Sequence, residues 1–513
     1  MAEAGDRNES RQFSAADNFS VMPGGGVVPF RMPAGALTYL DRNQYISNME
    51  IVGYFPDIDV QLFGDEYSCL WAKGKRRLIA HKSGFIDITE PTKAAEIANP
   101  YFGAPRPAFQ SCVYATRLKK WIRVVSWQMP LTGGTPQYPR GKYHEEYRRK
   151  SIDHPGFRGI KTYDITNPER PELLSEFETG RTGTGVHMPF YDGGKYAYLA
   201  CGWDDQLRME SSERVFSNGL MIVDMTDPSR IEEVSRWWVP GQRLDEEELY
   251  RSTYPFAGDQ CSWTCNRTPC IVPTRIEDGG TVGYGGWGHF GMYVHDLSDI
   301  RNPKVYGKVA HPLEAIGGIP YHHVMPITAD PERFPQLQNL VIAVPEALEV
   351  DCREPFHTSY IIDVKDRANP RIIGLFPRPM PHPDAPYKDF AMARGRFSSR
   401  VCQNWIAPGK ARPDVVALSY LNAGVRLFDI SDPTAPREVA YFVPPRHGEL
   451  DDFPSWKMGS TSAVFVEWDR NLIWISTLKG LYCLSAPFLG PPVLEPMAVS
   501  RWSIPHVNLG WDG

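Results

Sequence analysis

The sequence predicts an all-β fold, a seven-bladed β-propeller of four-stranded antiparallel blades closed by an N-terminal strand, and three observations predict it. A short unit recurs along the 513 residues: an apolar run that ends in Asp, a polar turn, and a second apolar run. Each copy follows another pair of apolar runs, so each unit holds four short strands. The copies lie 56 to 77 residues apart, as expected for one unit with loops of variable length.

The unit is clearest in four copies that share one register, with Asp five residues after Gly. They read GIKTYDITNP, GLMIVDMTDP, GMYVHDLSDI and GVRLFDISDP, and their aspartates are Asp164, Asp224, Asp296 and Asp429. Weaker copies surround Asp87, Asp363 and Ser485, which brings the total to seven. Four-stranded sheets repeated around an axis describe a propeller, in which each sheet packs between its two neighbours.

Ring closure requires a strand from one end of the chain to complete the blade at the other end. Residues 48–56, NMEIVGYFP, resemble the last strand of a repeat but have no repeat before them. We therefore predict that they complete the seventh blade, with PPVLEP near the C-terminus as a competitor. The expected organisation is an N-terminal arm at 1–47, a propeller at 48–490 and a C-terminal tail at 491–513.

The recurring Asp residues have a structural explanation. A short Asp, Ser or Asn side chain can accept hydrogen bonds from backbone amides where a strand ends, and Pro then fixes the turn. Recurrence in every blade also argues against catalysis, which would be confined to one. We predict that these aspartates shape turns.

The runs GLMIVDMTDP, GVRLFDISDP and GIKTYDITNP resemble the LVIVD-repeat family of β-propeller proteins. The resemblance spans all seven units and implies the propeller fold. It implies little about chemistry, because propellers host enzymes and binding scaffolds alike.

Composition excludes several classes of partner. A net charge of −6 offers no basic face for nucleic acid, and no apolar run approaches the ~18 residues of a membrane span. Neither a basic nor an apolar N-terminal signal precedes the repeats, and the nine cysteines are scattered, so we expect a cytoplasmic protein with reduced thiols.

Loop lengths distinguish the two faces of the predicted ring. The connections from second to third strand and from blade to blade are long, whereas the opposite connections are tight turns. We call the first the loop-rich face, where function is expected. Eleven of the thirteen histidines fall there: His81, His144, His154, His187, His289, His311, His322, His323, His357, His382 and His447.

The sharpest candidates begin the innermost strands, which line the axis. His187 opens blade three, His322 and His323 open blade five, and His289 comes from the Gly-rich connection of blade four between them. We predict that these imidazoles meet near one point, with Asp204 and Glu346 as carboxylates beside them.

Three functions are compatible with this pattern. The first is a small-molecule enzyme of the lyase, hydratase, isomerase or hydrolase type, without a cofactor, in which histidines transfer protons. The apolar or aromatic substrate of this enzyme would contact Trp203, Tyr321 and Trp263. Arg400 would bind a carboxylate or oxyanion of the substrate, and the site would also be lined by Asn404 and Tyr420. The second is a metal-dependent oxidoreductase or hydrolase with His187, His289, His322 and His323 holding a divalent ion. The third is a binding scaffold without catalysis.

Overall fold

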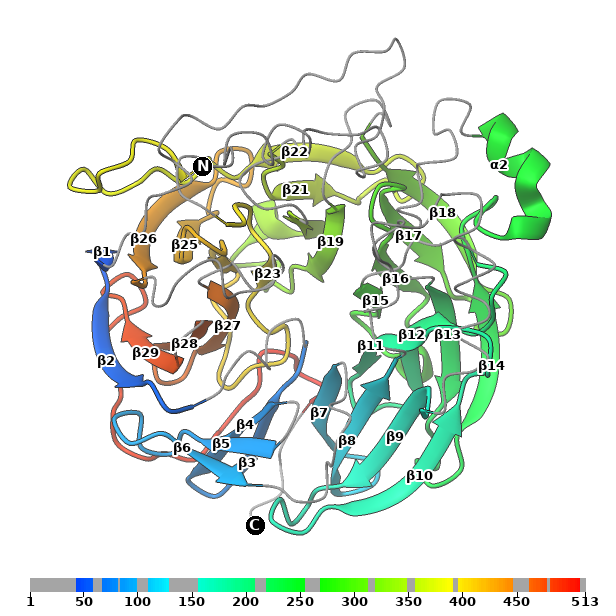
Figure 1. Ribbon diagram of the computed structural model, residues 1–513, viewed down its shortest axis with the longest axis horizontal. Helices are drawn as coiled ribbons and strands as arrows, with labels where there is room; N and C mark the ends of the chain where they lie inside the picture. Colours follow the sequence, from blue (N-terminus) through cyan, green and yellow to red (C-terminus); the bar gives the residue numbers. More distant parts are fainter. Residues whose placement is uncertain are drawn as a thin grey trace, which may run out of the picture.

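The chain forms a closed ring of seven antiparallel sheets around a central axis (Figure 1). This computed structural model describes residues 43–58, 67–81, 84–98, 109–128, 156–207, 218–253, 268–311, 319–347, 356–390, 395–445, 461–477 and 480–507. The predicted all-β fold, seven blades and four strands per blade are confirmed.

The first four blades follow one another in sequence, each numbered from its innermost strand outward. Blade one holds β3 (Leu70–Lys73), β4 (Arg76–His81), β5 (Gly84–Asp87) and β6 (Ala95–Ala98). Blade two holds β7 (Gln110–Ala115), β8 (Lys120–Trp127), β9 (Gly159–Asp164) and β10 (Glu172–Glu178). Blade three holds β11 (Gly185–Tyr191), β12 (Tyr196–Gly202), β13 (Gly219–Asp224) and β14 (Glu232–Trp237). Blade four holds β15 (Thr268–Ile271), β16 (Val282–Gly286), β17 (Met292–Asp296) and β18 (Lys304–Val309).

The remaining blades complete the ring. Blade five holds β19 (Ile319–Pro326), β20 (Leu340–Glu346), β21 (Tyr360–Asp363) and β22 (Arg371–Leu375). Blade six holds β23 (Val401–Cys402), β24 (Val415–Ser419), β25 (Val425–Asp429) and β26 (Arg437–Val443), and blade seven holds β27 (Thr461–Glu467), β28 (Leu472–Thr477) and β29 (Gly480–Ser485). A short helix, α2 (Glu247–Thr253), follows blade three.

The repeated motif forms the third strand of a blade and the turn after it. In blade six, Asp429 Oδ1 accepts a hydrogen bond from the Ser431 amide at 2.9 Å, and the same contact follows Asp87, Asp164, Asp224, Asp296 and Asp363. The Gly that opens this strand at 424 has φ +78°, and a Cβ there would lie 2.0 Å from the Phe442 carbonyl oxygen. The motif is therefore explained by backbone geometry.

An N-terminal strand closes the ring, as predicted. Strand β2 (Glu50–Phe55) pairs antiparallel with β29 and forms the outermost strand of blade seven. The competing segment at 491–496 is not in a strand. Just before β2, β1 (Tyr45–Ser47) pairs with β26 and gives blade six a fifth strand, so the last residues of the predicted arm join the propeller.

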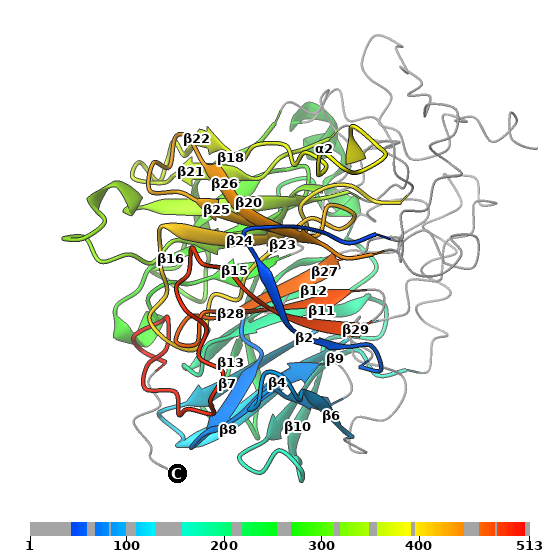
Figure 2. The ribbon, with the colours of Figure 1, turned by 90° about the vertical axis from the view of Figure 1, so that its left-hand side faces the viewer.

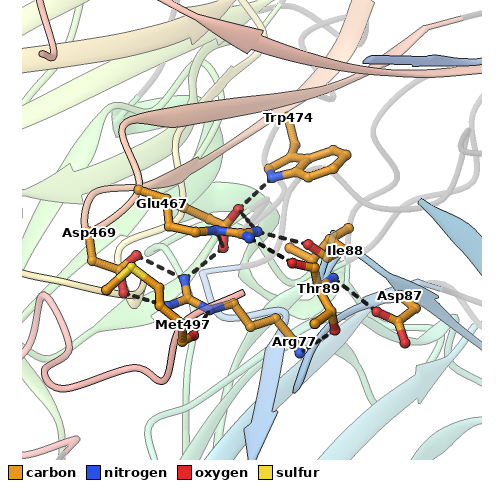
Figure 3. Close-up of polar contacts among 9 residues, drawn as sticks. Arg77, Asp87, Ile88, Thr89, Glu467, Asp469, Trp474 and Met497 are labelled. Atoms are coloured by element: carbon orange, nitrogen blue, oxygen red, sulfur yellow. Dashed lines mark hydrogen bonds and ion pairs between the residues drawn. The ribbon is translucent and has the colours of Figure 1, made fainter. Parts of the chain in front are cut away.

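A buried charge network reinforces this closure where blade one meets blade seven (Figure 3). Arg77 of β4 donates from Nη1 to Glu467 at 2.8 Å and from both terminal nitrogens to Asp469 at 2.9 and 2.8 Å. Its Nε donates to the Met497 carbonyl oxygen of the C-terminal tail at 3.0 Å. One guanidinium thus connects the first blade, the last blade and the tail.

A second arginine completes the network from the side of blade seven. Arg470 donates to Glu467 from Nε at 3.1 Å and from Nη2 at 2.6 Å, and to the carbonyl oxygens of Ile88 and Thr89 in blade one at 2.8 and 2.9 Å. Trp474 Nε1 donates to the same carboxylate at 2.8 Å. We call Arg77, Glu467, Asp469 and Arg470 the closure cluster, in which two positive charges meet two negative ones.

The C-terminal tail crosses the face opposite the loop-rich face, where Figure 2 shows it in red on one side of the ring. Trp502 forms an isolated antiparallel β-bridge with Pro408 of blade six. Its ring packs edge-on against that of Trp121 in blade two, with ring centroids 6.2 Å apart. His506 Nε2 lies 3.0 Å from Asp192 Oδ2 of blade three. The tail therefore ties together blades that are far apart in the sequence.

No helix within the described ranges is both long enough and apolar enough to cross a bilayer.

Candidate active site at the mouth of the ring

Aromatic side chains from several blades fill the axis and make a floor. The Tyr67 ring stacks on His323 of β19 with centroids 4.6 Å apart and meets Phe190 of β11 edge-on at 5.7 Å. Trp405, after β23, lies 5.8 Å from Phe190. Tyr67 Oη also donates to the Val324 carbonyl oxygen at 2.6 Å. We call the axial end above this floor, on the loop-rich face, the mouth.

Innermost strands lose their regular pairing just above the floor. The register of β11 against β12 shifts between Val186 and Met188, so His187 is an inserted residue. The register of β19 shifts between Ile319 and His323, and that of β27 shifts between Thr461 and Ala463. Such bulges re-aim side chains and are common beside active sites.

The break in β19 places His322 in a buried cluster around one carboxylate. Glu346 Oε1 accepts from Arg396 Nη2 at 2.5 Å and from Arg400 Nε at 3.3 Å, and Oε2 lies 3.2 Å from His322 Nε2. Arg400 Nη1 donates to the carbonyl oxygen of Ser462, in the break of β27, at 2.8 Å. We call His322, Glu346, Arg396 and Arg400 the mouth cluster.

The hydrogen bonds of His322 specify its charge. Its Nδ1 lies 3.2 Å from the Arg400 carbonyl oxygen, and its Nε2 faces the Glu346 carboxylate. Both partners are acceptors, so both ring nitrogens must carry protons for both contacts to be favourable. With both protons His322 is an imidazolium, and it lies with the guanidiniums of Arg396 and Arg400 around the Glu346 carboxylate.

Across the mouth, His187 is held in a different state. Its Nδ1 lies 2.8 Å from Gln128 Oε1, an acceptor, so this contact favours a proton on Nδ1. The ring meets Phe109 edge-on at 4.8 Å. Because His187 precedes Phe190 by three residues, it lies about 10 Å above the floor at the usual rise of a strand.

His323 points the other way from its neighbour because successive side chains of a strand alternate. Its ring is stacked in the floor, and it is 1% exposed. Burial, with smaller effects from the charges of His322 and Arg400, holds the pKa of His323 well below its usual value. His323 is therefore neutral and belongs to the floor.

The structure thus brings together three of the residues expected in the site, His322, Glu346 and Arg400, and places His187 on another wall of the same mouth. It does not gather the four imidazoles at one point. His289 is buried in the turn between β16 and β17, where Gly288 bridges to Tyr321. Within the described ranges, no three His, Cys, Asp or Glu side chains are arranged to hold a metal ion, so the predicted set of His187, His289, His322 and His323 is corrected.

Blade three does not contribute its expected neighbours. Trp203 lies against the outer strand, where the Arg236 guanidinium is 5.1 Å from its ring centroid and Trp238 is 6.1 Å away. Asp204 pairs with Arg243 at 3.2 Å and accepts from the Gln206 amide. The expectation that Trp203 and Asp204 line the mouth is corrected, because their contacts are with the outer strand of blade three and the segment that follows it.

Tyr321 and Tyr420 are both fully buried inside their blades. The Tyr321 ring packs against His311 at 5.5 Å and Tyr360 at 5.8 Å, and the Tyr420 ring lies 6.2 Å from Phe428. Burial raises the pKa of both phenols. Neither ring belongs to the mouth cluster, which corrects their expected role.

Asn404 lies toward the opposite face. It lines a cavity of about 40 Å³ together with Met325, Gln403, Trp468 and Ile504 of the tail. This volume holds a few waters at most, so the cavity is too small for a substrate. Trp263 lies outside the described residues.

Sequence reasoning missed three residues that complete the site: Gln128, Arg396 and Ser462. Arg396 had a recognisable signal, since RGRFSSR places three arginines just before the innermost strand of blade six. Gln128 and Ser462 had none, because each acts through a contact with a distant blade.

The comparisons with known proteins agree with this architecture. The model of the LVIVD repeat matches residues 215–238, which include β13 and β14. The chain is a seven-bladed β-propeller that carries a match to the LVIVD repeat. No curated protein matches this LVIVD-repeat protein in sequence.

Matching solved structures include two propeller proteins. The β-propeller domain of Myceliophteria thermophila Cps50 (Swd1) is 11% identical, covers 83% of the LVIVD-repeat chain and 99% of its own, and has a TM-score of 0.42. U3-55K is 9% identical, with coverages of 86% and 98% and a TM-score of 0.43. Neither similarity supports an inference about what the LVIVD-repeat protein binds.

Proposed function

We propose that this protein is a small-molecule enzyme that uses acid–base chemistry at the mouth of the ring, with His187 as the residue that transfers the proton. The bond from His187 Nδ1 to Gln128 carries the proposal. It favours a proton on Nδ1, and in the neutral ring Nε2 is then the atom that accepts a proton, as a general base requires.

The two histidines of the mouth differ in role under this proposal. His322 holds protons on both nitrogens and faces two acceptors, so it cannot accept another. His187 has one protonated nitrogen and one lone pair. Proton transfer is therefore assigned to His187, and His322 is assigned to charge and positioning.

The floor of the mouth suits an apolar or aromatic substrate. Tyr67, Phe190 and Trp405 make this part of the axis apolar, the neutral His323 adds no charge, and none of these residues is more than 4% exposed. The acidic composition supports a cytoplasmic protein that acts on small molecules and not on nucleic acid.

The test is conversion of small molecules by the purified full chain. A metabolite extract is incubated with the wild type, with His187→Gln and with His506→Gln, and mass spectrometry records which compounds are consumed. We expect consumption by the wild type and by His506→Gln, whose substitution lies on the opposite face, and a loss of about 100-fold or more in His187→Gln.

Two results would overturn the proposal. Equal consumption by His187→Gln and the wild type would remove His187 from the chemistry. If the wild type binds compounds from the extract but consumes none, the protein is a binding scaffold without catalysis.

A further inference from the structure

The chain that follows β23 runs from blade six to blade one, although blade seven stands between these blades in the ring. Ile406 donates from its amide to the Tyr67 carbonyl oxygen at 2.8 Å and forms a parallel β-bridge with Ser68. We call residues 403–409 the crossing segment. Because Trp405 belongs both to this segment and to the floor of the mouth, the position of the segment sets the position of the floor.

The C-terminal tail packs against the crossing segment from the face opposite the mouth. The Gly409 amide donates to the Arg501 carbonyl oxygen at 2.7 Å, and the Ser503 amide donates to the Ala407 carbonyl oxygen at 2.9 Å. These bonds lie on either side of the β-bridge that Trp502 forms. The crossing segment is therefore held between blade one on one side and the tail on the other.

The Ser503 hydroxyl makes a second pair of contacts with the crossing segment. Its Oγ donates to the Trp405 carbonyl oxygen at 2.6 Å and accepts from the Ala407 amide at 2.9 Å. One hydroxyl thus spans the backbone on both sides of Ile406. Trp405 and Ala407 are 4% and 0% exposed, so loss of the hydroxyl removes these bonds at a site where water does not readily replace it.

Tyr67 connects the crossing segment to the strand that carries His322. Its carbonyl oxygen accepts from the Ile406 amide, and its ring stacks on His323. Its Oη donates to the Val324 carbonyl oxygen at 2.6 Å. His322 directly precedes these two residues on β19, and close-packed interiors transmit displacements between neighbours. A shift of the crossing segment therefore reaches the mouth cluster through Tyr67.

Resting on the proposed function, we infer that Ser503 is a positioning residue for the mouth. The C-terminal tail, through this hydroxyl, fixes the crossing segment, and the crossing segment fixes the floor and the part of β19 that carries His322. His187 stands on another wall, so the distance between it and the mouth cluster depends on this support. Catalytic rates are sensitive to displacements of about 1 Å.

The test compares four full-length variants with the wild type. Ser503→Ala removes the hydroxyl, whereas Ser503→Thr keeps it, and the small cavity that Ser503 lines gives room for the added methyl group. Ser500→Ala is the matched control, because Ser500 is an exposed serine of the same tail. His506→Gln is a second control, because its contact is with Asp192 of blade three and not with the crossing segment.

NMR reports on the floor and on the mouth separately. In protein labelled with 5-fluorotryptophan, the ¹⁹F resonance of Trp405 is assigned by comparison with Trp405→Phe. In protein with ¹⁵N-labelled histidine, the ring resonances of His322 are assigned by comparison with His322→Gln. We expect both sets of resonances to shift in Ser503→Ala and to stay at their wild-type positions in Ser503→Thr and in the two controls.

For a compound that the wild type consumes, kcat/KM should fall by about 10-fold in Ser503→Ala and recover in Ser503→Thr. Three results would each overturn the inference: a Trp405 resonance that does not move in Ser503→Ala, a His322 resonance that stays in place while that of Trp405 moves, or an unchanged kcat/KM. If the wild type consumes no compound, the proposed function fails by itself, and the two resonances still decide whether the tail positions the mouth.

Discussion

The closure cluster and the mouth cluster are built from the same kinds of side chain but differ in their burial. At the closure of the ring, Arg77 and Arg470 face Glu467 and Asp469, and their donors also reach backbone carbonyl oxygens (Figure 3). At the mouth, Arg396, Arg400 and the His322 imidazolium all contact Glu346, and the Arg400 side chain is 17% exposed.

This difference separates a structural network from a binding site. Fully buried charges with their hydrogen bonds satisfied hold two blades together. Charged side chains placed beside strand breaks at the loop-rich face, one of them partly exposed, are where a ligand would be met. The predictions below test that distinction.

The largest effect is expected from Glu467→Gln. This variant leaves Arg77 and Arg470 buried with Asp469 as their only carboxylate, and breaking a buried pair in this way costs about 3–5 kcal/mol. The unfolding midpoint in denaturant measures it. Glu233→Gln, which breaks the partly exposed pair with Arg236, should cost no more than about 1 kcal/mol, and equal losses would contradict the structural role of the closure cluster.

The second effect concerns pH. Burial alone would raise the pKa of Glu467, but the charges of Arg470 and Arg77 outweigh it and hold that pKa below its usual 4.5. A lowered carboxylate pKa contributes stability that is present above the unfolded value and is lost as the pH falls through the folded value. The stability of the wild type should therefore fall more steeply than that of Glu467→Gln below about pH 4.5, as thermal unfolding at each pH would show. Parallel curves would contradict it.

A smaller and salt-dependent effect is expected from Glu346→Gln. The variant removes the carboxylate that His322, Arg396 and Arg400 contact, but the exposed part of Arg400 lets ions and water screen the change. We expect a loss of about 1–3 kcal/mol at low salt that shrinks as salt is added. The loss in Glu467→Gln should change little with salt, because its charges are fully buried. Equal salt dependence would remove the contrast between the two clusters.

The smallest effect is expected at the repeated turn, which lies outside both clusters. Asp429→Ala removes the bonds to Ser431 and the ion pair to Arg437 at 2.9 Å, all near the surface. A loss of about 0.5–1.5 kcal/mol follows, measured in denaturant. A change in the consumption of extract compounds would be unexpected and would indicate that these turns do more than shape the blade.

The fold was predictable because the sequence contains seven copies of the same repeat. The Asp turns, the four strands of each blade and the closing role of residues 48–56 follow from patterns within about twenty residues of one another. The closure cluster was not predictable, because Arg77 and Glu467 are 390 residues apart and nothing local to either specifies the other.

The candidate site was predictable only where the ring geometry acts directly. Innermost strands begin at the loop-rich face, so His187, His322 and Arg400 were expected at the mouth. Because side chains alternate along a strand, His323 lies in the floor while His322 lies in the mouth cluster. Trp203 and Asp204 contact the outer part of their own blade and do not line the mouth. Both depend on local register and loop paths, which a single sequence does not specify.

The most direct test of the central claim is the protonation state of His322 in the full-length protein. NMR of protein with ¹⁵N-labelled histidine, with the resonance assigned by comparison with His322→Gln, reports on each ring nitrogen near neutral pH. The account predicts an imidazolium with protons on both nitrogens, while His187 carries one. A neutral His322 ring would leave one contact to the Arg400 carbonyl oxygen or to Glu346 unmade, and it would contradict the assignment of His322 to charge and positioning and of His187 to proton transfer.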